Sequence, residues 1–147
     1  DDEEEHSTEL HMPYICHVMK GHPFKMVHVM VGSLSRSREV FYGKFFSRYL
    51  DDPSFLFVIS SDFCHWGSRF EYVHYDDSHG EIHQHISHLD HQAMDIISSL
   101  DGDAFERYMK ETKNTICGRK PIAVLLEAVR HASTSFTLSF THYAQSS

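Results

Sequence analysis

The sequence predicts an α/β domain in which helices flank a mixed sheet, and three observations support this class. Helix-like and strand-like apolar patterns alternate along the chain, which is typical of α/β proteins. An apolar run at residues 55–59 predicts a buried strand, and an acid, a thiol and an imidazole follow it within residues 62–67. Because open α/β sheets carry reactive side chains just past the carboxyl ends of strands, residues 62–67 are a candidate site. The chain has 147 residues, 41% of them hydrophobic, and no repeat or linker divides residues 1–147, which predicts a single domain.

The first half of the chain predicts two helices and two strands. A helix is expected over about residues 7–20, and Pro13 either kinks this helix or marks its true first turn. Apolar runs predict strands over residues 26–31 and 55–59. Between these strands, residues 38–50 carry aromatic side chains at helical spacing, which predicts a helix with one aromatic face. The residues of that face are Phe41, Phe45, Phe46 and Tyr49.

The second half predicts a loop, three helices and a final strand. Residues 68–78 are polar and aromatic, which favours a loop. An apolar stripe predicts a long helix over about residues 80–100, and a shorter helix is expected over 103–110. A proline suited to a first helical turn predicts another helix from about residue 118. Apolar and polar residues alternate over 135–143, which predicts a strand.

Charge and composition exclude several classes of function. The formal net charge is −8 with histidine neutral, which argues against general nucleic-acid binding. No apolar stretch is long enough for a membrane span, so membrane insertion is not expected. The three cysteines, Cys16, Cys64 and Cys117, are widely spaced and form no paired motif, which favours reduced thiols in the cytoplasm. Each cysteine is either a small buried hydrophobe or, in the case of Cys64, part of the candidate site.

Asp62 and His65 are the candidate catalytic residues. A carboxylate three positions before an imidazole can hold the ring in one tautomer for proton transfer. In the alternative interpretation, Asp62 caps the turn after the strand and His65 has no special role.

Two further positions are candidates for ligand binding. His6 precedes the first predicted helix, where it can face a pocket or serve as an ordinary surface or capping group. Residues 114–119 lead into a helix start, where backbone N–H groups and Arg119 could hold a carboxylate or a phosphate. The alternative is an ordinary turn followed by a solvated arginine.

Histidines gather on and beside the long helix predicted over residues 80–100. Some of them have the i, i+3 and i, i+4 spacings found among metal ligands. Most nevertheless flank or oppose the apolar stripe, so the pattern predicts a solvated face with adventitious metal binding at most. These histidines are His79, His83, His85, His88 and His91.

Five separated segments resemble the Memo family, which is named for mediating cell motility driven by receptor tyrosine kinases. The segments follow one another in the same order as in that family: residues 5–14, 29–35, 60–67, 114–122 and 143–147. Because family members are about twice this long, the chain resembles their middle segment. The resemblance implies an α/β domain related in fold to class III extradiol dioxygenases, incomplete within this chain.

The resemblance also implies a pocket in which two histidines and one cysteine bind iron or copper. His6 is the only metal ligand of that set that maps onto this chain, since the other two would lie upstream of Asp1 and beyond Ser147. One imidazole cannot hold a transition metal tightly, so this chain alone is expected to bind neither iron nor copper tightly. His65 corresponds to the histidine that acts as acid and base in the dioxygenases, with Asp62 beside it.

Two functions from different classes follow as expectations. The first is a signalling adaptor in cell motility and cytoskeletal control, in the cytoplasm and secondarily in the nucleus. Its pocket binds metal and takes a phosphotyrosine-bearing segment of a phosphorylated receptor tyrosine kinase or its adaptor. Its candidate ligand-binding residues are His6, Cys64, His65 and Arg119. The alternative is an iron- or copper-dependent redox enzyme, in which His6 ligates the metal, His65 shuttles protons and Asp62 orients His65.

Overall fold

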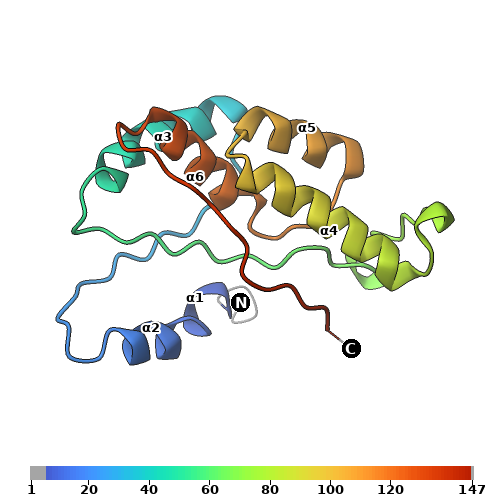
Figure 1. Ribbon diagram of the computed structural model, residues 1–147, viewed down its shortest axis with the longest axis horizontal. Helices are drawn as coiled ribbons and strands as arrows, with labels where there is room; N and C mark the ends of the chain where they lie inside the picture. Colours follow the sequence, from blue (N-terminus) through green and yellow to red (C-terminus); the bar gives the residue numbers. More distant parts are fainter. Residues whose placement is uncertain (1–5, 147) are drawn as a thin grey trace.

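The computed structural model describes residues 6–146, and its regular elements are helical (Figure 1). The helices are α1 (His6–Glu9), α2 (Met12–Val18), α3 (Arg36–Leu50), η2 (Ser68–Phe70), η3 (Asp77–His79), α4 (Ile82–Ser98), α5 (Gly102–Thr112) and α6 (Arg119–His131). The two η elements are single 3₁₀ turns inside the segment predicted as a loop.

The predicted mixed sheet is wrong for the described residues 6–146, and so is the dioxygenase-like α/β fold that the resemblance implied. Residues 26–31, 55–59 and 135–143 run as coil, and the β-type pairing within 6–146 is one isolated antiparallel bridge between Gly67 and Tyr72. A strand is defined by hydrogen bonds to a neighbouring strand, and an apolar pattern does not supply that neighbour.

The side chains of these coil segments show the same lack of a partner. Val27 and Leu56 are each 82% exposed, although they lie in the runs that predict buried strands. The apolar pattern therefore identifies residues that are suited to a β-sheet. Within residues 6–146, however, these residues have no neighbouring strand with which to pair.

The predicted helices of the second half are confirmed, and their ends have local causes. Glu81 and Gln84 form a reciprocal capping box at the start of α4. Asp101 caps α5 by accepting hydrogen bonds from the N–H groups of Asp103 (3.0 Å) and Ala104 (2.9 Å). In the first half, the helix expected over 7–20 is divided into α1 and α2, and Pro13 lies in the first turn of α2.

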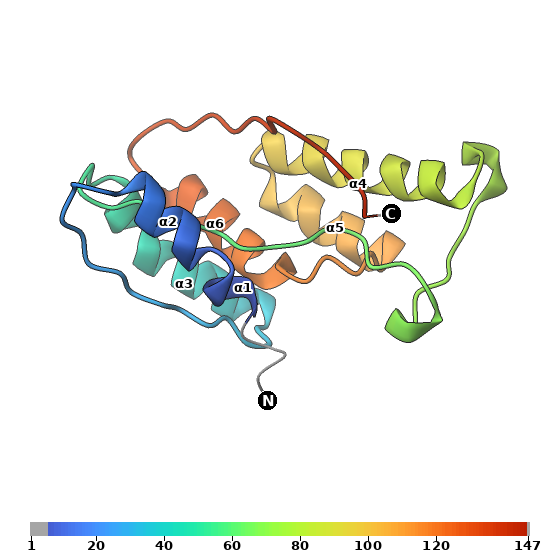
Figure 2. The same cartoon turned by 90° about the horizontal axis from the view of Figure 1, so that it is seen from below.

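Four helices build the packed part of the molecule. In both views α3 lies beside α6 and α4 lies beside α5, while α5 also contacts α6 (Figures 1 and 2). The hydrophobic core is built by α4, α5, α6 and the coil before α6, and consists of Ala93, Ile97, Phe105, Tyr108, Ile116, Ile122 and Leu126. The coil that follows α3 runs along this helical layer and packs Ile59 and Phe63 against the core, and Leu138 of the C-terminal coil joins them.

Helix α3 buries a different face from the one its aromatic residues predict. Glu39, Gly43 and Ser47 are its buried residues, whereas Phe41 is 57% exposed. The aromatic side chains do contact one another, and two of them reach the following coil. The ring of Phe46 lies 6.0 Å from that of Phe57, and the ring of Tyr49 lies 4.9 Å from that of Phe55.

Gly43 allows α3 to approach α6 closely. A Cβ atom at Gly43 would lie 2.3 Å from the Cβ atom of Glu127 and 2.8 Å from its backbone carbon. The Glu127 side chain is 1% exposed and forms an ion pair with Arg36 of α3. Lys120 of α6 pairs with Glu39 of α3 at 2.6 Å. Because a buried charge is costly without a partner, these ion pairs fix the register of the two helices.

Within residues 6–146, every helix is too short or too polar to cross a membrane.

We predict that Gly43→Ala destabilises the fold. Alanine favours a helix by about 1 kcal/mol over glycine, but the added methyl group would overlap backbone atoms of α6 that cannot move independently. The free energy of unfolding should fall by about 1–3 kcal/mol, measured by urea denaturation. Gly32→Ala is the matched control, since a Cβ there meets no atom within 4 Å. Equal unfolding midpoints for the two variants would refute the close helix contact.

Candidate functional site

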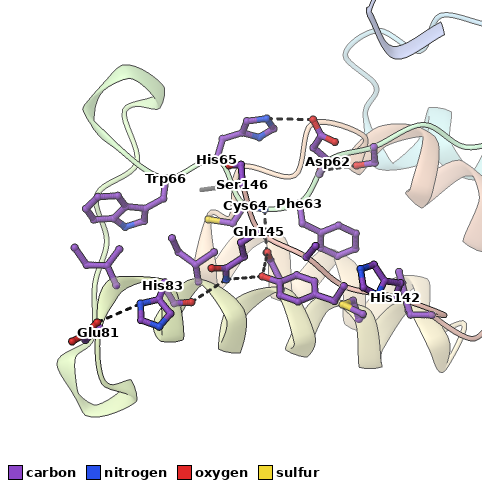
Figure 3. A pocket seen from close by; sticks show the side chains of 18 of the residues that line it. Asp62, Phe63, Cys64, His65, Trp66, Glu81, His83, His142, Gln145 and Ser146 are labelled. Carbon is purple, nitrogen blue, oxygen red and sulfur yellow. Dashed lines mark hydrogen bonds and ion pairs between the residues drawn. The ribbon is translucent and has the colours of Figure 1, made fainter. Parts of the chain in front are cut away.

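An open cleft of about 1070 Å³ lies where three segments meet, and Figure 3 shows its walls. One wall is the coil 61–66, the second is the first half of α4, and the third is the C-terminal coil 140–146. Phe63 and Phe140 contact each other edge to face at 5.9 Å and join the first wall to the third. The cleft therefore contains the residues that the sequence singled out after the central apolar run.

The buried carboxylate of Asp90 holds these walls together. It is 3% exposed and accepts hydrogen bonds from the backbone N–H of Cys64 (3.0 Å) and the hydroxyl of Tyr143 (2.9 Å). The side-chain amide of Asn114 lies at 3.5 Å from the same carboxylate and donates to the hydroxyl of Tyr108 at 2.8 Å. Burial raises the pKa of Asp90 above its ordinary value, although these hydrogen bonds act in the opposite direction.

His65 is oriented by Thr115. The Nδ1 atom of His65 lies 3.1 Å from the carbonyl oxygen of Thr115, and because a carbonyl can only accept, Nδ1 carries the proton. The Thr115 hydroxyl accepts from the backbone N–H of His65 at 2.6 Å and donates to the His65 carbonyl at 2.8 Å. The ring therefore has a fixed tautomer, with Nε2 left as the basic nitrogen.

Asp62 lies on the same side of the coil as His65. Figure 3 shows both side chains pointing away from α4 and toward each other. The Oδ2 atom of Asp62 is 3.8 Å from Nε2 of His65, which is too long for a hydrogen bond but suits an ion pair once the imidazole is protonated. The structure thus brings the predicted pair together, while the carbonyl of Thr115 performs the orienting role that the sequence assigned to Asp62.

Cys64 is placed in the cleft as a thiol. Burial, and secondarily the charge of Asp90, raises the pKa of Cys64 to about 11, so this sulfur is protonated at neutral pH. A protonated thiol is a poor nucleophile and a poor metal ligand, because both roles use the thiolate.

Arg119 lies outside the cleft. It is exposed at the first position of α6 and is absent from the residues that line the cavity. The helix start beside it is covered by the chain itself, since the N–H of Gly118 donates to the hydroxyl of Ser61 at 2.9 Å. A Cβ at Gly118 would lie 2.3 Å from the Cβ of Ser61. Ser61 thus contacts the helix start at which an anion was expected.

His6 begins α1, and its side chain lies outside the described part of the structure. Among the described residues, no three histidine, cysteine, aspartate or glutamate side chains already surround a point where a metal ion could sit. The side chains that the structure describes in the cleft therefore do not by themselves fit an iron or copper centre.

The cleft is also poor in fixed positive charge. The described residues that line it include no lysine or arginine, and the carboxylates of Asp62, Glu81 and Asp90 are present. The histidines His65, His83 and His142 are the groups there that can become cationic.

The prediction that the histidines on and beside α4 form a solvated face is wrong for His85. His83 is exposed as expected, with 64% of its side chain accessible. His85 is only 2% exposed, because the coil and the 3₁₀ turn before α4 fold back over it. The helical periodicity of α4 does not predict that His85 is buried, because the residues that bury it lie outside the helix.

Two residues of the site carry no obvious signal of their own in the sequence. Thr115 lies in a segment that suggested an anion site, and Asp90 lies on the predicted long helix among the histidines. One signal was available for Asp90. It lies beside the apolar stripe of the predicted helix, and a carboxylate in such a position is usually buried with hydrogen-bond partners.

Comparisons with known proteins agree with the motifs. The chain matches the family model described as Memo-like protein over residues 1–147. Protein MEMO1 of Rattus norvegicus is 53% identical and Protein MEMO1 of Homo sapiens 52% identical over 151 residues, covering 99% of this chain and 51% of each relative. Protein memo-1 homolog of Caenorhabditis elegans is 46% identical over 151 residues, covering 99% of this chain and 43% of the relative.

The chain belongs to the Memo-like family. It spans about half the length of the curated relatives it matches.

We predict that Asp90→Ala loosens the cleft. The substitution leaves the backbone N–H of Cys64 and the hydroxyl of Tyr143 without their acceptor, although it also removes a costly buried charge. The free energy of unfolding should fall by about 1–3 kcal/mol in urea denaturation. Hydrogen exchange at the Cys64 amide should accelerate as well. Asp95→Ala, at an exposed position of the same helix, is the control and should change neither quantity.

Proposed function

We propose that this protein is a Memo-like signalling adaptor in receptor-tyrosine-kinase-driven cell motility and cytoskeletal control, and that its cleft binds a phosphotyrosine-bearing peptide. Membership of the Memo-like family supports the general role. The proposed partner is a phosphorylated receptor tyrosine kinase or its adaptor. The proposed location is the cytoplasm, with the nucleus as a second location.

One observation carries the peptide-binding part of the proposal. His65 lines the cleft, and its Nδ1 is tied to the Thr115 carbonyl, so Nε2 is the nitrogen left to donate to a phosphate once protonated. Trp66, Phe140 and Tyr143 also line the cleft and offer aromatic surface for the tyrosine ring of a ligand. A cleft formed by two coils and a helix offers backbone and side-chain groups to an extended peptide.

The charges of the cleft determine how such a peptide would bind. Since its cations can come only from histidines among the described lining residues, phosphate recognition depends on imidazole protonation. Asp62, whose side chain is 85% exposed, opposes an incoming phosphate.

We predict opposite effects for two neighbouring substitutions on phosphopeptide affinity. His65→Ala removes the proposed donor and should weaken binding about 10-fold, whereas Asp62→Asn removes a repulsive charge and should strengthen it about 3-fold. Fluorescence polarisation at pH 6.5 with a matched pair of phosphorylated and unphosphorylated tyrosine peptides measures both effects. The control is His22→Ala, at an exposed histidine outside the cleft. Equal affinity for the two peptides, or no response to His65→Ala, would refute phosphotyrosine recognition here.

The second candidate function is an iron- or copper-dependent redox enzyme. It is favoured by the tautomer of His65, because a free Nε2 next to Asp62 suits a group that accepts and returns a proton. The Thr115 carbonyl and the Asp62 carboxylate would both stabilise the resulting imidazolium. Iron or copper would supply the electron transfer, with His6 as the proposed metal ligand. Since the described side chains do not complete a metal centre, no redox step is derived from them.

Removal of the metal separates the two candidates. The adaptor proposal predicts that chelation and His6→Ala both leave phosphopeptide affinity unchanged in fluorescence polarisation. Redox activity in a chain extended to include the other two ligands that the resemblance implies, lost on chelation and in His6→Ala, would favour the redox enzyme instead. The control is His22→Ala, which should change neither quantity.

A further inference from the structure

A short segment before α4 folds back over the start of that helix. We call residues 73–80, which include the turn η3, the η3 segment, and they lie beside the start of α4 (Figures 1 and 2). Every residue of the η3 segment is exposed. Segments with few buried contacts open at a low cost in free energy, so the η3 segment can leave α4 without unfolding the core.

The η3 segment covers the imidazole of His85, which lies in the first turns of α4. The centroid of its ring lies 5.6 Å from that of His74, 5.8 Å from that of Tyr75 and 5.7 Å from that of His79. This cover leaves His85 only 2% exposed, and neither Nδ1 nor Nε2 has a hydrogen-bond partner within residues 6–146. A charged imidazole there would lack both water and a hydrogen-bond acceptor, so the covered ring is uncharged.

The groups around His85 also disfavour a charge on its ring. Burial lowers the pKa of His85 below its ordinary value, and positive charge on His74 or His79 acts in the same direction. The carboxylate of Asp76 opposes these effects, whereas His88, three residues further along α4, adds to them. The N-terminus of α4 carries a partial positive charge as well. A proton on this ring is therefore favoured only when the ring leaves its cover.

The η3 segment also holds one side chain of the cleft. The indole N–H of Trp66 donates to the backbone carbonyl of His74 at 3.0 Å, and Trp66 lines the cleft together with Tyr75 and Glu81. Trp66 is half-buried and is the only tryptophan of the chain. Displacement of the η3 segment would remove the hydrogen-bond acceptor of Trp66 and would move Tyr75 out of this wall.

We propose that protonation of His85 releases the η3 segment from α4 and frees Trp66, so that mild acid rearranges one wall of the cleft. In the released form the ring reaches water and has the ordinary pKa of an exposed histidine, about 6.5. The covered form has the lower pKa and binds fewer protons, so it loses stability relative to the released form as the pH falls below about 6.5. Each further pH unit favours the released form by up to about 10-fold. This transition belongs to the chain itself and does not depend on what the cleft binds.

The fluorescence of Trp66 tests this proposal in the intact chain. As the pH falls from about 8 to 5, the emission maximum should shift to longer wavelength and quenching by acrylamide should increase, with a midpoint below about pH 6.5. His85→Phe keeps an aromatic ring that cannot be protonated, so both changes should be lost. His22→Phe, at an exposed histidine outside the cleft, is the matched control and should retain both. No change in the native chain, or the same change in His85→Phe, would overturn the proposal.

Two further measurements exclude other causes. Protonated His65, the sequence neighbour of Trp66, could quench the emission, so a change that is lost in His65→Ala and retained in His85→Phe would contradict the proposal. If circular dichroism shows that His85→Phe does not fold at pH 8, NMR titration of the native chain decides. The ring of His85 and the indole N–H of Trp66 should then share one midpoint, and separate midpoints would overturn the proposal. Since no ligand is present, failure of phosphopeptide binding would change none of these results.

Discussion

The cleft depends on one buried carboxylate. Asp90 projects from the middle of α4 and ties down two coil segments that have no regular structure of their own, through the backbone of Cys64 and the hydroxyl of Tyr143. Its neighbour Asn114 bonds to Tyr108, whose hydroxyl in turn donates to the carbonyl of Leu89 at 2.8 Å. Hydrogen bonds linked in this way reinforce one another in a low-dielectric interior, and they hold the two coils against α4.

The contact between α3 and α6 follows a different principle. At this interface a glycine, a serine and charged side chains are buried, while the aromatic residues of α3 face the neighbouring coil and solvent. The packing of α3 on α6 is determined by the close backbone approach at Gly43 and by the ion pair between Arg36 and Glu127. Large apolar side chains contribute little to this contact. Such an interface is specific in register, because a shift of either helix would bury an unpaired charge.

Histidine lies in two different environments in this chain. In the cleft, the Thr115 carbonyl fixes the tautomer of His65 and leaves one nitrogen free for proton exchange or for a bound anion. The buried ring of His85 lies near His74 and His79, and within residues 6–146 its nitrogens have no hydrogen-bond partner. The first environment fixes the ring in one tautomer, whereas the second leaves a buried ring without a hydrogen bond. The same side chain thus gains its role from the hydrogen bonds around it.

The sequence by itself determined the family, four of the helices and the segment that forms the cleft. Helical periodicity and capping are local properties, so α3 to α6 could be predicted, and the acid–imidazole pair was found because it follows an apolar run. Only the tertiary structure decided that the runs at 26–31, 55–59 and 135–143 form no ladder within residues 6–146, because pairing depends on a neighbour rather than on the run itself. It also decided that Thr115 orients His65 and that His85 is covered, since both contacts join residues distant from the predicted motif or outside the helix.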